Sequence, residues 1–296
     1  MQLDKATLKK EIEGRGLQVI LTSNPGNPTG ALLEGQELQD IVDVAKQTHC
    51  SFILDEFYSH FIYSHGEEDL GRSVSGASFV DDVNKDPIII VDGLTKNWRL
   101  PGWRMAWVLA PKSNDFISTY FSLKNSKDLQ KSILAVVSTL QSAGSFLDGG
   151  ANHVLQDTII KSNILDYDFV KLDTAILQKV FKEKRDFVIS RITALGIKID
   201  SVPNGTFYIW ANVIDLPPPL NNGMSFFECA LLFKVIVVPG IFFDVNPGKR
   251  RELFNSPFHH YIRISYGPSM DALKIGMDAF EALVKKYSHV HEHVGQ

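Results

Sequence analysis

The sequence has 296 residues, of which 44% are hydrophobic and 22% charged, and its formal net charge is -4. These values are typical of a globular protein with a sizeable core and roughly one to three domains, and they exclude a strongly basic surface for nucleic acid. The longest apolar stretches, such as 87–91 and 235–239, are too short to span a bilayer. Cys50 and Cys229 lie far apart, and the first residues lack the apolar core of a signal peptide. We therefore expect a cytoplasmic protein with no metal site, no nucleic-acid partner and no membrane partner.

The first part of the chain is expected to alternate helices with short, continuous apolar strands. The helices are expected at about 5–14 and 34–49, and the strands at about 19–22, 52–54, 88–91 and 105–109. This alternation is typical of a mostly parallel sheet covered by helices on both faces. In such sheets ligands bind beyond the carboxyl ends of the strands.

The rest of the chain is expected to change to strands with terminal helices. Helices are expected at about 115–141, 168–195 and 271–286, and strands at about 207–211, 235–238 and 261–265. The change of pattern indicates a second, smaller α+β domain. We expect a large domain at 1–165, a small domain at 166–290 and a tail at 291–296.

Three polar segments follow predicted strands in the first part of the chain. They are the Pro/Gly/Asn loop 24–30, the residues from Asp55 to Tyr58, and the turn that contains Lys96. Each alone is typical of an ordinary turn, a helix cap or a surface lysine. Their joint occurrence at strand ends favours one common site, because the ends of parallel strands meet at one edge of the sheet.

Lys96 has the setting that Schiff-base chemistry on a phosphorylated aldehyde requires. It follows an apolar strand, and Arg104 comes eight residues later. Only the neutral amine attacks an aldehyde, and burial or a neighbouring cation lowers the pKa of a lysine. The planar donor fork of an arginine suits a phosphate group.

Together these segments resemble the aminotransferase class I/II family of pyridoxal-phosphate (PLP) enzymes, which have the aspartate-aminotransferase-like fold type I. The resemblance extends from about Val19 to Lys286 and includes a strand with an interior arginine, Arg263. It implies a mostly parallel sheet sandwiched by helices, plus the smaller C-terminal α+β domain. It also implies transfer of an amino group between an amino acid and a 2-keto acid, within biosynthetic amino acid metabolism, by a homodimer.

The resemblance implies catalytic roles for Lys96, Asp55 and Tyr58. Lys96 would hold PLP as a Schiff base and carry the proton from the substrate Cα. Asp55 would pair with the pyridine nitrogen, which makes the ring an electron sink. Tyr58 and Asn27 would donate to the phenolic oxygen of the cofactor.

Further binding roles are implied in the same way. Thr95 and Arg104 would bind the cofactor phosphate. Arg263 would bind the substrate α-carboxylate in a bidentate fork, together with Asn27. The segment 238–244 resembles a loop at the lip of the family's active site.

The sequence departs from the family pattern in three places. Its start lacks the long N-terminal segment of the family, which carries a further phosphate-binding loop and an aromatic residue that stacks on the ring. We therefore expect a shortened large domain with unpaired strand edges and weaker cofactor retention. Gly93 stands where many members have serine, and Ala106 stands where glycine is common.

Two alternatives remain open at this point. A PLP-dependent lyase or synthase would use the same residues for elimination or cyclising chemistry, and ammonia release would distinguish a lyase from transamination, which forms a keto acid together with pyridoxamine phosphate. A non-catalytic, truncated remnant would not retain PLP at all.

Overall fold

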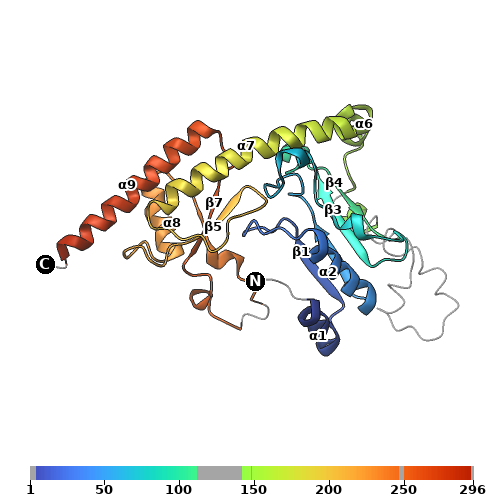
Figure 1. Cartoon of the computed structure of the whole chain (residues 1–296), viewed down its shortest axis with the longest axis horizontal. Coiled ribbons are helices and arrows are strands. Elements are labelled where there is room, and N and C mark those ends of the chain that lie inside the picture. The colour runs from blue at the N-terminus through green and yellow to red at the C-terminus, as the bar shows by residue number, and fades with distance from the viewer. Residues whose placement is uncertain (1–4, 112–141, 148, 247–249, 295–296) are drawn as a thin grey trace. The chain divides into compact units, whose positions relative to one another are not determined.

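The structure, a computed structural model, describes the chain except residues 1–4, 112–141, 148, 247–249 and 295–296 (Figure 1). The helix expected at 115–141 lies outside the described residues. The chain separates into two compact units. The first comprises Met1–Pro25, Leu33–His60 and Gly71–Thr174, and the second comprises Gly26–Leu32, Phe61–Leu70 and Ala175–Gln296. The domain limits expected from the sequence, 165 and 166, stay a prediction beside this division.

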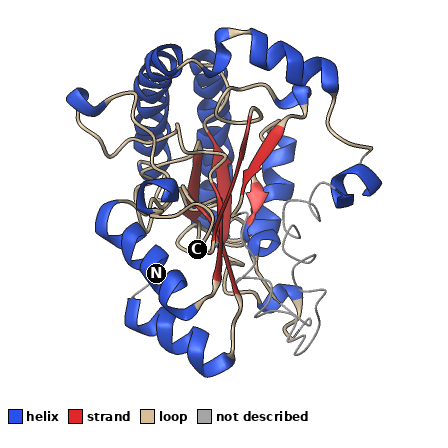
Figure 2. Ribbon diagram, turned by 90° about the vertical axis from the view of Figure 1, so that its right-hand side faces the viewer, coloured by secondary structure: helices blue, strands red, loops and turns tan. Residues whose placement is uncertain are grey.

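The first unit contains a four-stranded sheet in the order β1-β2-β3-β4. Its strands are β1 (Val19–Ser23), β2 (Ser51–Asp55), β3 (Ile88–Gly93) and β4 (Ala106–Leu109). β1, β2 and β3 run parallel, and β4 runs antiparallel to β3. The mostly parallel sheet with helices is thus confirmed, and Figure 2 shows the strands in red among the helices in blue.

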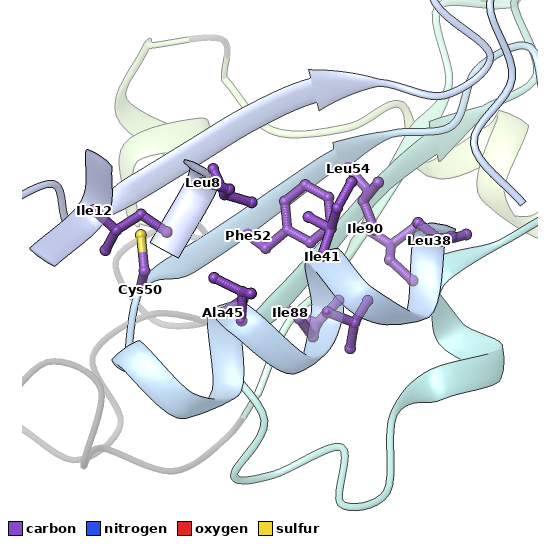
Figure 3. Packing of buried hydrophobic residues seen from close by; sticks show 12 residues of the cluster. Leu8, Ile12, Leu38, Ile41, Ala45, Cys50, Phe52, Leu54, Ile88 and Ile90 are labelled. Atoms are coloured by element: carbon purple, nitrogen blue, oxygen red, sulfur yellow. The ribbon is translucent and has the colours of Figure 1, made fainter. Parts of the chain in front are cut away.

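The main core of this unit lies where two helices pack together and against the sheet. These helices are α1 (Lys5–Arg15) and α2 (Gly35–Thr48). α2 buries Leu38, Ile41 and Ala45, the apolar face expected from the sequence, in one cluster with Phe52 and Leu54 of β2 (Figure 3). Each of these side chains is at most 2% exposed, and burial of a leucine, isoleucine or phenylalanine side chain contributes about 1.5–3 kcal/mol. This packing holds β2, and hence its carboxyl end, in place.

β1 forms one edge of the described sheet. Leu21 in this strand is 71% exposed and Val19 is 41% exposed. An open edge with apolar side chains is a ready surface for pairing with another strand. The exposed edge expected from the sequence is present in the described residues.

The other elements of the first unit are short, apart from the start of a long helix. They are η2 (Gly76–Phe79), η3 (Pro101–Trp103), α6 (His153–Lys161), η4 (Asn163–Leu165) and the first part of α7 (Tyr167–Thr193). A second apolar cluster contains Leu94, Met105 and Ile159, with partly buried tryptophans packed around them. This cluster supports the turn that follows β3.

The second unit contains a three-stranded antiparallel sheet in the order β5-β7-β6. Its strands are β5 (Tyr208–Asn212), β6 (Val238–Pro239) and β7 (Tyr261–Ser265). Its helices are η1 (Glu67–Asp69), the rest of α7, α8 (Gly223–Leu232), η5 (Gly240–Phe243), η7 (Leu253–Asn255) and α9 (Met270–Val294). A small antiparallel sheet with helices confirms the smaller α+β part.

Two features of the second unit differ from the sequence expectation. No helix is expected from the sequence at α8, yet its residues 223, 226 and 230 are buried at helical spacing, and the Asn222 side chain caps its start by accepting from the amides of Met224 and Ser225. The strand expected at 235–238 begins only at Val238, because the preceding residues close α8. Their amides bond to carbonyls of the last turn of that helix.

No helix among the described residues combines the length and apolar character needed to cross a membrane. Cys50 is buried and Cys229 is partly buried, and both are free thiols.

Candidate active site

The carboxyl ends of the three parallel strands meet at one edge of the sheet in the first unit. Ser23 at the end of β1 is paired in register with Asp55 at the end of β2, and Asp55 is paired with Val91 of β3. The backbone continues the alignment, since the amide of Asn24 donates to the carbonyl of Asp55 at 2.9 Å. The sheet therefore brings the ends of the loop 24–30, Asp55 and the turn after β3 to the same edge.

Asn24 closes the loop that follows β1. It is fully buried, and its side chain donates to the carbonyl of Leu33 and accepts from the amide of Leu33, both at 2.8 Å. Further along the loop, Gly30 has φ 68° and a Cβ on it would lie 2.3 Å from Pro203 Cβ, so only glycine fits. The Pro/Gly/Asn pattern of the sequence thus has a structural reason at both places.

Asp55 and Tyr58 lie at and just beyond the end of β2. The Asp55 carboxylate is half-buried and accepts from the amide of Phe57 at 3.2 Å. Burial raises the pKa of Asp55, and this hydrogen bond opposes the rise. Tyr58 is 5% exposed and lies in the turn that follows. Asp55 forms no ion pair with a cation of the described residues. A partly desolvated carboxylate of this kind is suited to pair with a cationic ring nitrogen.

Lys96 lies in a tight turn directly after β3. Leu94 is fully buried and its amide donates to the carbonyl of Met105 at 3.0 Å, which anchors the start of the turn. The amide of Arg99 donates to the carbonyl of Lys96 at 3.0 Å, and Arg99 has a left-handed φ of 57°. Thr95 and Lys96 are both partly buried. The turn is therefore held by backbone bonds at its start and at the carbonyl of Lys96.

Arg104 lies between η3 and β4. It is exposed, has a left-handed φ of 52°, and its Nη1 donates to the carbonyl of Pro101 at 3.1 Å. Trp98, Trp103 and Trp107 pack against the second apolar cluster. The guanidinium of Arg104 thus remains open to an anionic ligand.

The other two predicted residues, Asn27 and Arg263, lie together in the second unit. Arg263 Nη1 donates to Asn27 Oδ1 at 2.8 Å. The guanidinium carbon lies 4.0 Å from the ring centre of Tyr208 and 4.8 Å from that of Phe243. No carboxylate of the described residues is within ion-pair distance of Arg263. Such an arginine is placed by its aromatic neighbours and retains donors for a carboxylate ligand.

The alternation of β7 explains how an arginine is accommodated in this strand. Ile262 and Ile264 are buried on one face, whereas Arg263 is on the opposite, partly exposed face. Phe243, in the loop that the sequence indicated as a lip, supplies one of the rings beside it. Arg263 would be a buried charge only if both faces of β7 were buried. Because the face that carries Arg263 is partly exposed, the arginine fits the strand.

Sequence reasoning missed three polar residues of the first unit, of which Glu56 and Asn97 are buried and Asp92 is partly buried. Glu56 is 3% exposed and its Oε1 accepts from the amide of Gly76 at 2.8 Å, while Asn97 is fully buried in the turn of Lys96. Asp92 lies near the end of β3, and its Oδ1 accepts from the side-chain amide of Asn97 at 2.9 Å. The signal for Asp92 was available, since a carboxylate that follows four apolar residues of a strand needs a partner just as Arg263 does.

The pKa values of these groups depart from their ordinary values mainly through burial. Burial raises the pKa of Asp92 to about 7, and the neighbouring carboxylates of Glu56 and Asp55 add to the rise. Burial raises the pKa of Glu56 to about 6. It lowers the pKa of the nearby His60 to about 4. The edge of the sheet thus carries several carboxyl groups that do not all ionise together near neutral pH.

We expect the Asp92→Asn variant to gain stability over the wild type as the pH rises. Because the folded-state pKa of Asp92 is about 7 and its ordinary value is 3.8, its contribution is fully present below 3.8 and lost as the pH rises through 7. The difference in unfolding free energy, variant minus wild type, should grow by about 1–3 kcal/mol from about pH 5 to about pH 8. Urea unfolding of both proteins at several pH values measures it, and Glu56 and His60 are common to both. A difference independent of pH would contradict the expectation.

The two small departures from the family pattern, Gly93 and Ala106, are cross-strand partners. They face each other where β3 pairs with β4. A Cβ on Gly93 would lie 2.8 Å from the Ala106 Cβ, and 2.7 Å from both Ala106 Cα and the carbonyl oxygen of Met105. The methyl group of Ala106 therefore occupies part of the space that a side chain at position 93 would need, and backbone atoms of Met105 and Ala106 occupy the rest.

We expect Gly93→Ser to lower the unfolding free energy by about 1–3 kcal/mol, because of this overlap. Adding Ala106→Gly removes one of the three contacts, so the double variant should lose less stability than the sum of the two single variants. Urea unfolding of the four proteins of the cycle measures this coupling. Additive losses would show that the two positions are independent.

The residues of the first unit have the chemistry that a phosphorylated pyridine aldehyde requires. They comprise a primary amine in Lys96, a half-buried carboxylate in Asp55, a phenol in Tyr58, a hydroxyl in Thr95 and an accessible guanidinium in Arg104. A Schiff base needs the amine, a protonated ring needs the carboxylate, and the phenolic and phosphate oxygens need the donors. Among the described residues, no group of three or more His, Cys, Asp or Glu side chains is placed to hold a metal ion.

Comparison with known proteins adds an independent line of evidence. The sequence model of the family described as aminotransferase class I and II matches residues 1–280. A probable N-acetyl-LL-diaminopimelate aminotransferase of Bacillus subtilis is 26% identical over 90% of this chain and 55% of its own length. An aspartate aminotransferase of Pyrococcus abyssi is 26% identical over 96% of this chain and 61% of its own length.

Solved structures show the same fold. An aspartate aminotransferase from Thermus thermophilus with maleate has a TM-score of 0.69 at 20% identity, covering 95% of this chain and 60% of that chain. An aromatic aminotransferase from Pyrococcus horikoshii OT3 has a TM-score of 0.68 at 24% identity, covering 96% and 64%. The chain thus spans less than two thirds of the length of these relatives.

Proposed function

Because the chain belongs to the aminotransferase class I and II family, we propose that it is a PLP-dependent aminotransferase that moves an amino group between an amino acid and a 2-keto acid. The observation that carries the proposal is the order of Asp55, Tyr58 and Lys96 at the carboxyl ends of the adjacent parallel strands β2 and β3. The names of the relatives refer to different amino acids, so the proposal extends to the class of substrate only.

PLP, when bound, supplies an aldehyde that reacts with amines and a ring that draws electrons from the substrate Cα. In the proposed reaction Lys96 would hold the cofactor through its amine and would carry the proton taken from the substrate Cα. The turn after β3 restricts this motion to the side chain, because the backbone of Lys96 is hydrogen-bonded. Asp55 balances the charge of the protonated ring nitrogen, and burial strengthens that interaction.

The remaining residues of the first unit, and Asn27 of the second, are proposed to bind the cofactor's oxygens. Tyr58 donates to the phenolic oxygen, with Asn27 as a second donor. Thr95 and Arg104 bind the phosphate, Arg104 through its exposed guanidinium.

Arg263 is proposed to bind the substrate carboxylate, with Asn27 beside it. Its planar guanidinium is stacked on Tyr208 and bonded to Asn27, so it is already oriented before a ligand arrives. The same proposal includes the domain limits 1–165 and 166–290, a homodimer and a cytoplasmic location, as expected from the sequence.

We expect Arg263→Lys to raise KM for the amino acid by about tenfold to a hundredfold, with a smaller effect on kcat. Lysine retains the charge but loses the bidentate fork and the stacking on Tyr208. Steady-state kinetics at saturating PLP measures the change, with the exposed Arg15→Lys as the matched control. An unchanged KM would remove Arg263 from the proposed substrate site.

The proposed function is tested on the wild-type protein. The protein is mixed with PLP, freed of excess cofactor and reduced with borohydride, and peptide mapping then locates the attached cofactor. The expected result is a visible absorbance band before reduction and a label on the peptide with Lys96. Addition of amino acids should yield a keto acid and aminated cofactor; ammonia release would favour a lyase, and a colourless protein without label would contradict the proposal.

A further inference from the structure

Asn97 lies between the turn that carries Lys96 and the segment that carries Tyr58. It follows Lys96 directly and is fully buried. Its side chain bonds to residues of the segment 56–60, which continues from Asp55. A fully buried side-chain amide stabilises the folded state only if its hydrogen bonds are made. The amide of Asn97 makes these bonds to the neighbouring strand end, directly beside Lys96.

The orientation of this amide is determined by one partner. The backbone amide of His60 donates to Asn97 Oδ1 at 3.1 Å, and a backbone N–H is a donor only. Asn97 Nδ2 must therefore face the acceptors on the other side. These are Asp92 Oδ1 at 2.9 Å, Ser59 Oγ at 3.0 Å and the carbonyl of Glu56 at 3.2 Å.

The acceptor on Asp92 is itself held in place. Asp92 Oδ1 also accepts from the amide of Gly93 at 2.6 Å, at the end of β3. On the opposite side, Arg99 Nη1 donates to the carbonyl of Asn97 at 3.0 Å, and its Nη2 bonds to both carboxylate oxygens of Asp173 at 2.7 and 2.8 Å. The residue next to Lys96 is therefore tied to three parts of the first unit: the end of β3, the segment after β2 and the start of α7.

Resting on the proposed function, we propose that Asn97 is a positioning residue, whose buried side chain, anchored on Asp92, sets the place of the Lys96 amine relative to Asp55 and Tyr58. The hydrogen bonds of the Asn97 amide join the turn of Lys96 to the segment 56–60, beside the ring contact of His60 with Trp98 at 4.8 Å. A displacement of about 1 Å in a reacting group is enough to lower a rate about a hundredfold. The role of Asn97 is thus geometric, and it acts through Lys96.

Asn97→Asp is the sharpest test of this role. Aspartate has the same shape and still accepts from the amide of His60. It lacks the two amide hydrogens that Asn97 donates to Asp92 Oδ1 and to the acceptors of the segment 56–59. The measured quantity is the rate at which borohydride-trappable PLP attaches to Lys96, located by peptide mapping. We expect the rate to fall at least about tenfold relative to the wild type.

A reciprocal exchange separates positioning from simple loss of stability. In the double variant Asp92→Asn/Asn97→Asp the amide of residue 92 can donate to the carboxylate of residue 97, which restores a bond between the two side chains in exchange for the bond that the amide of Gly93 donates to Asp92. We expect the attachment rate to recover by at least about threefold over Asn97→Asp alone. Val44→Ala, a truncation in the core on α2 where Val44 is fully buried, serves as the control for lost stability. Melting temperatures are recorded for all variants.

The outcomes distinguish this inference from the proposed function. A slow Asn97→Asp with recovery in the exchange, beside an unaffected Val44→Ala, supports the positioning role. If Asn97→Asp attaches PLP as fast as the wild type, or if Val44→Ala slows attachment equally, the positioning role is overturned while the proposed function stands. If the wild type itself attaches no PLP at Lys96, the proposed function fails and this inference fails with it.

Discussion

Lys96→Ala is expected to abolish attachment of PLP to the protein and to lower transamination by about 10⁴-fold or more. The variant lacks both the amine that binds the aldehyde and the group that moves the substrate proton. Borohydride trapping followed by peptide mapping measures the first loss, and keto acid formation measures the second.

The fold should tolerate this change, because the turn of Lys96 is held by backbone bonds and by its buried neighbours Leu94 and Asn97. Lys171→Ala, which removes an exposed lysine from the start of α7, is the matched control. It should retain both trapping and activity. A Lys96→Ala protein that still transaminates at the wild-type rate would refute the assignment of Lys96.

Asp55→Asn is expected to lower kcat/KM by about 10²- to 10³-fold while leaving attachment of PLP to Lys96 intact. An amide cannot balance the charge of the ring nitrogen, so the ring becomes a weaker electron sink. Steady-state kinetics and borohydride trapping on the same preparation separate the two effects.

The stability of this variant should change in the opposite direction. Since burial raises the pKa of Asp55, the ionised carboxylate destabilises the folded state near neutral pH. Asp55→Asn should therefore be at least as stable as the wild type at about pH 7, and a loss of activity with retained stability is typical of a functional residue. Asp157→Asn, on the exposed face of α6, is the control. A variant that loses activity only through unfolding would contradict the prediction.

The sequence predicted most of the elements because their signals are local. The apolar run at 52–54 and the helical periodicity at 34–49 correspond to β2 and α2 within one or two residues. α8 was missed although its residues 223, 226 and 230 are buried at helical spacing and the cap at Asn222 determines its start. The short β6 was overextended because residues 233–235 close the preceding helix, and that bonding is invisible in an apolar run.

The residues of the candidate site also fall into two groups: those that a local sequence signal predicts, and those whose role depends on the folded sheet. Asp55, Tyr58 and Lys96 could be chosen because each directly follows an apolar strand, and parallel strands end at one edge. Asn97 could not be chosen, because its importance lies in bonds to Ser59 and Asp92, which the chain brings near only when the sheet forms.

The sequence by itself determined most of the strands and helices, the family resemblance, and the reactive groups at the strand ends. These follow from residue types at fixed spacing, and spacing along a strand or helix translates directly into a face or an end. The tertiary structure decided which of these groups are buried, which carboxyls have raised pKa values, and which atoms would overlap a side chain at position 93. The physical reason is that burial, hydrogen-bond partners and steric overlap depend on contacts between residues distant in the chain, and no local pattern encodes those contacts.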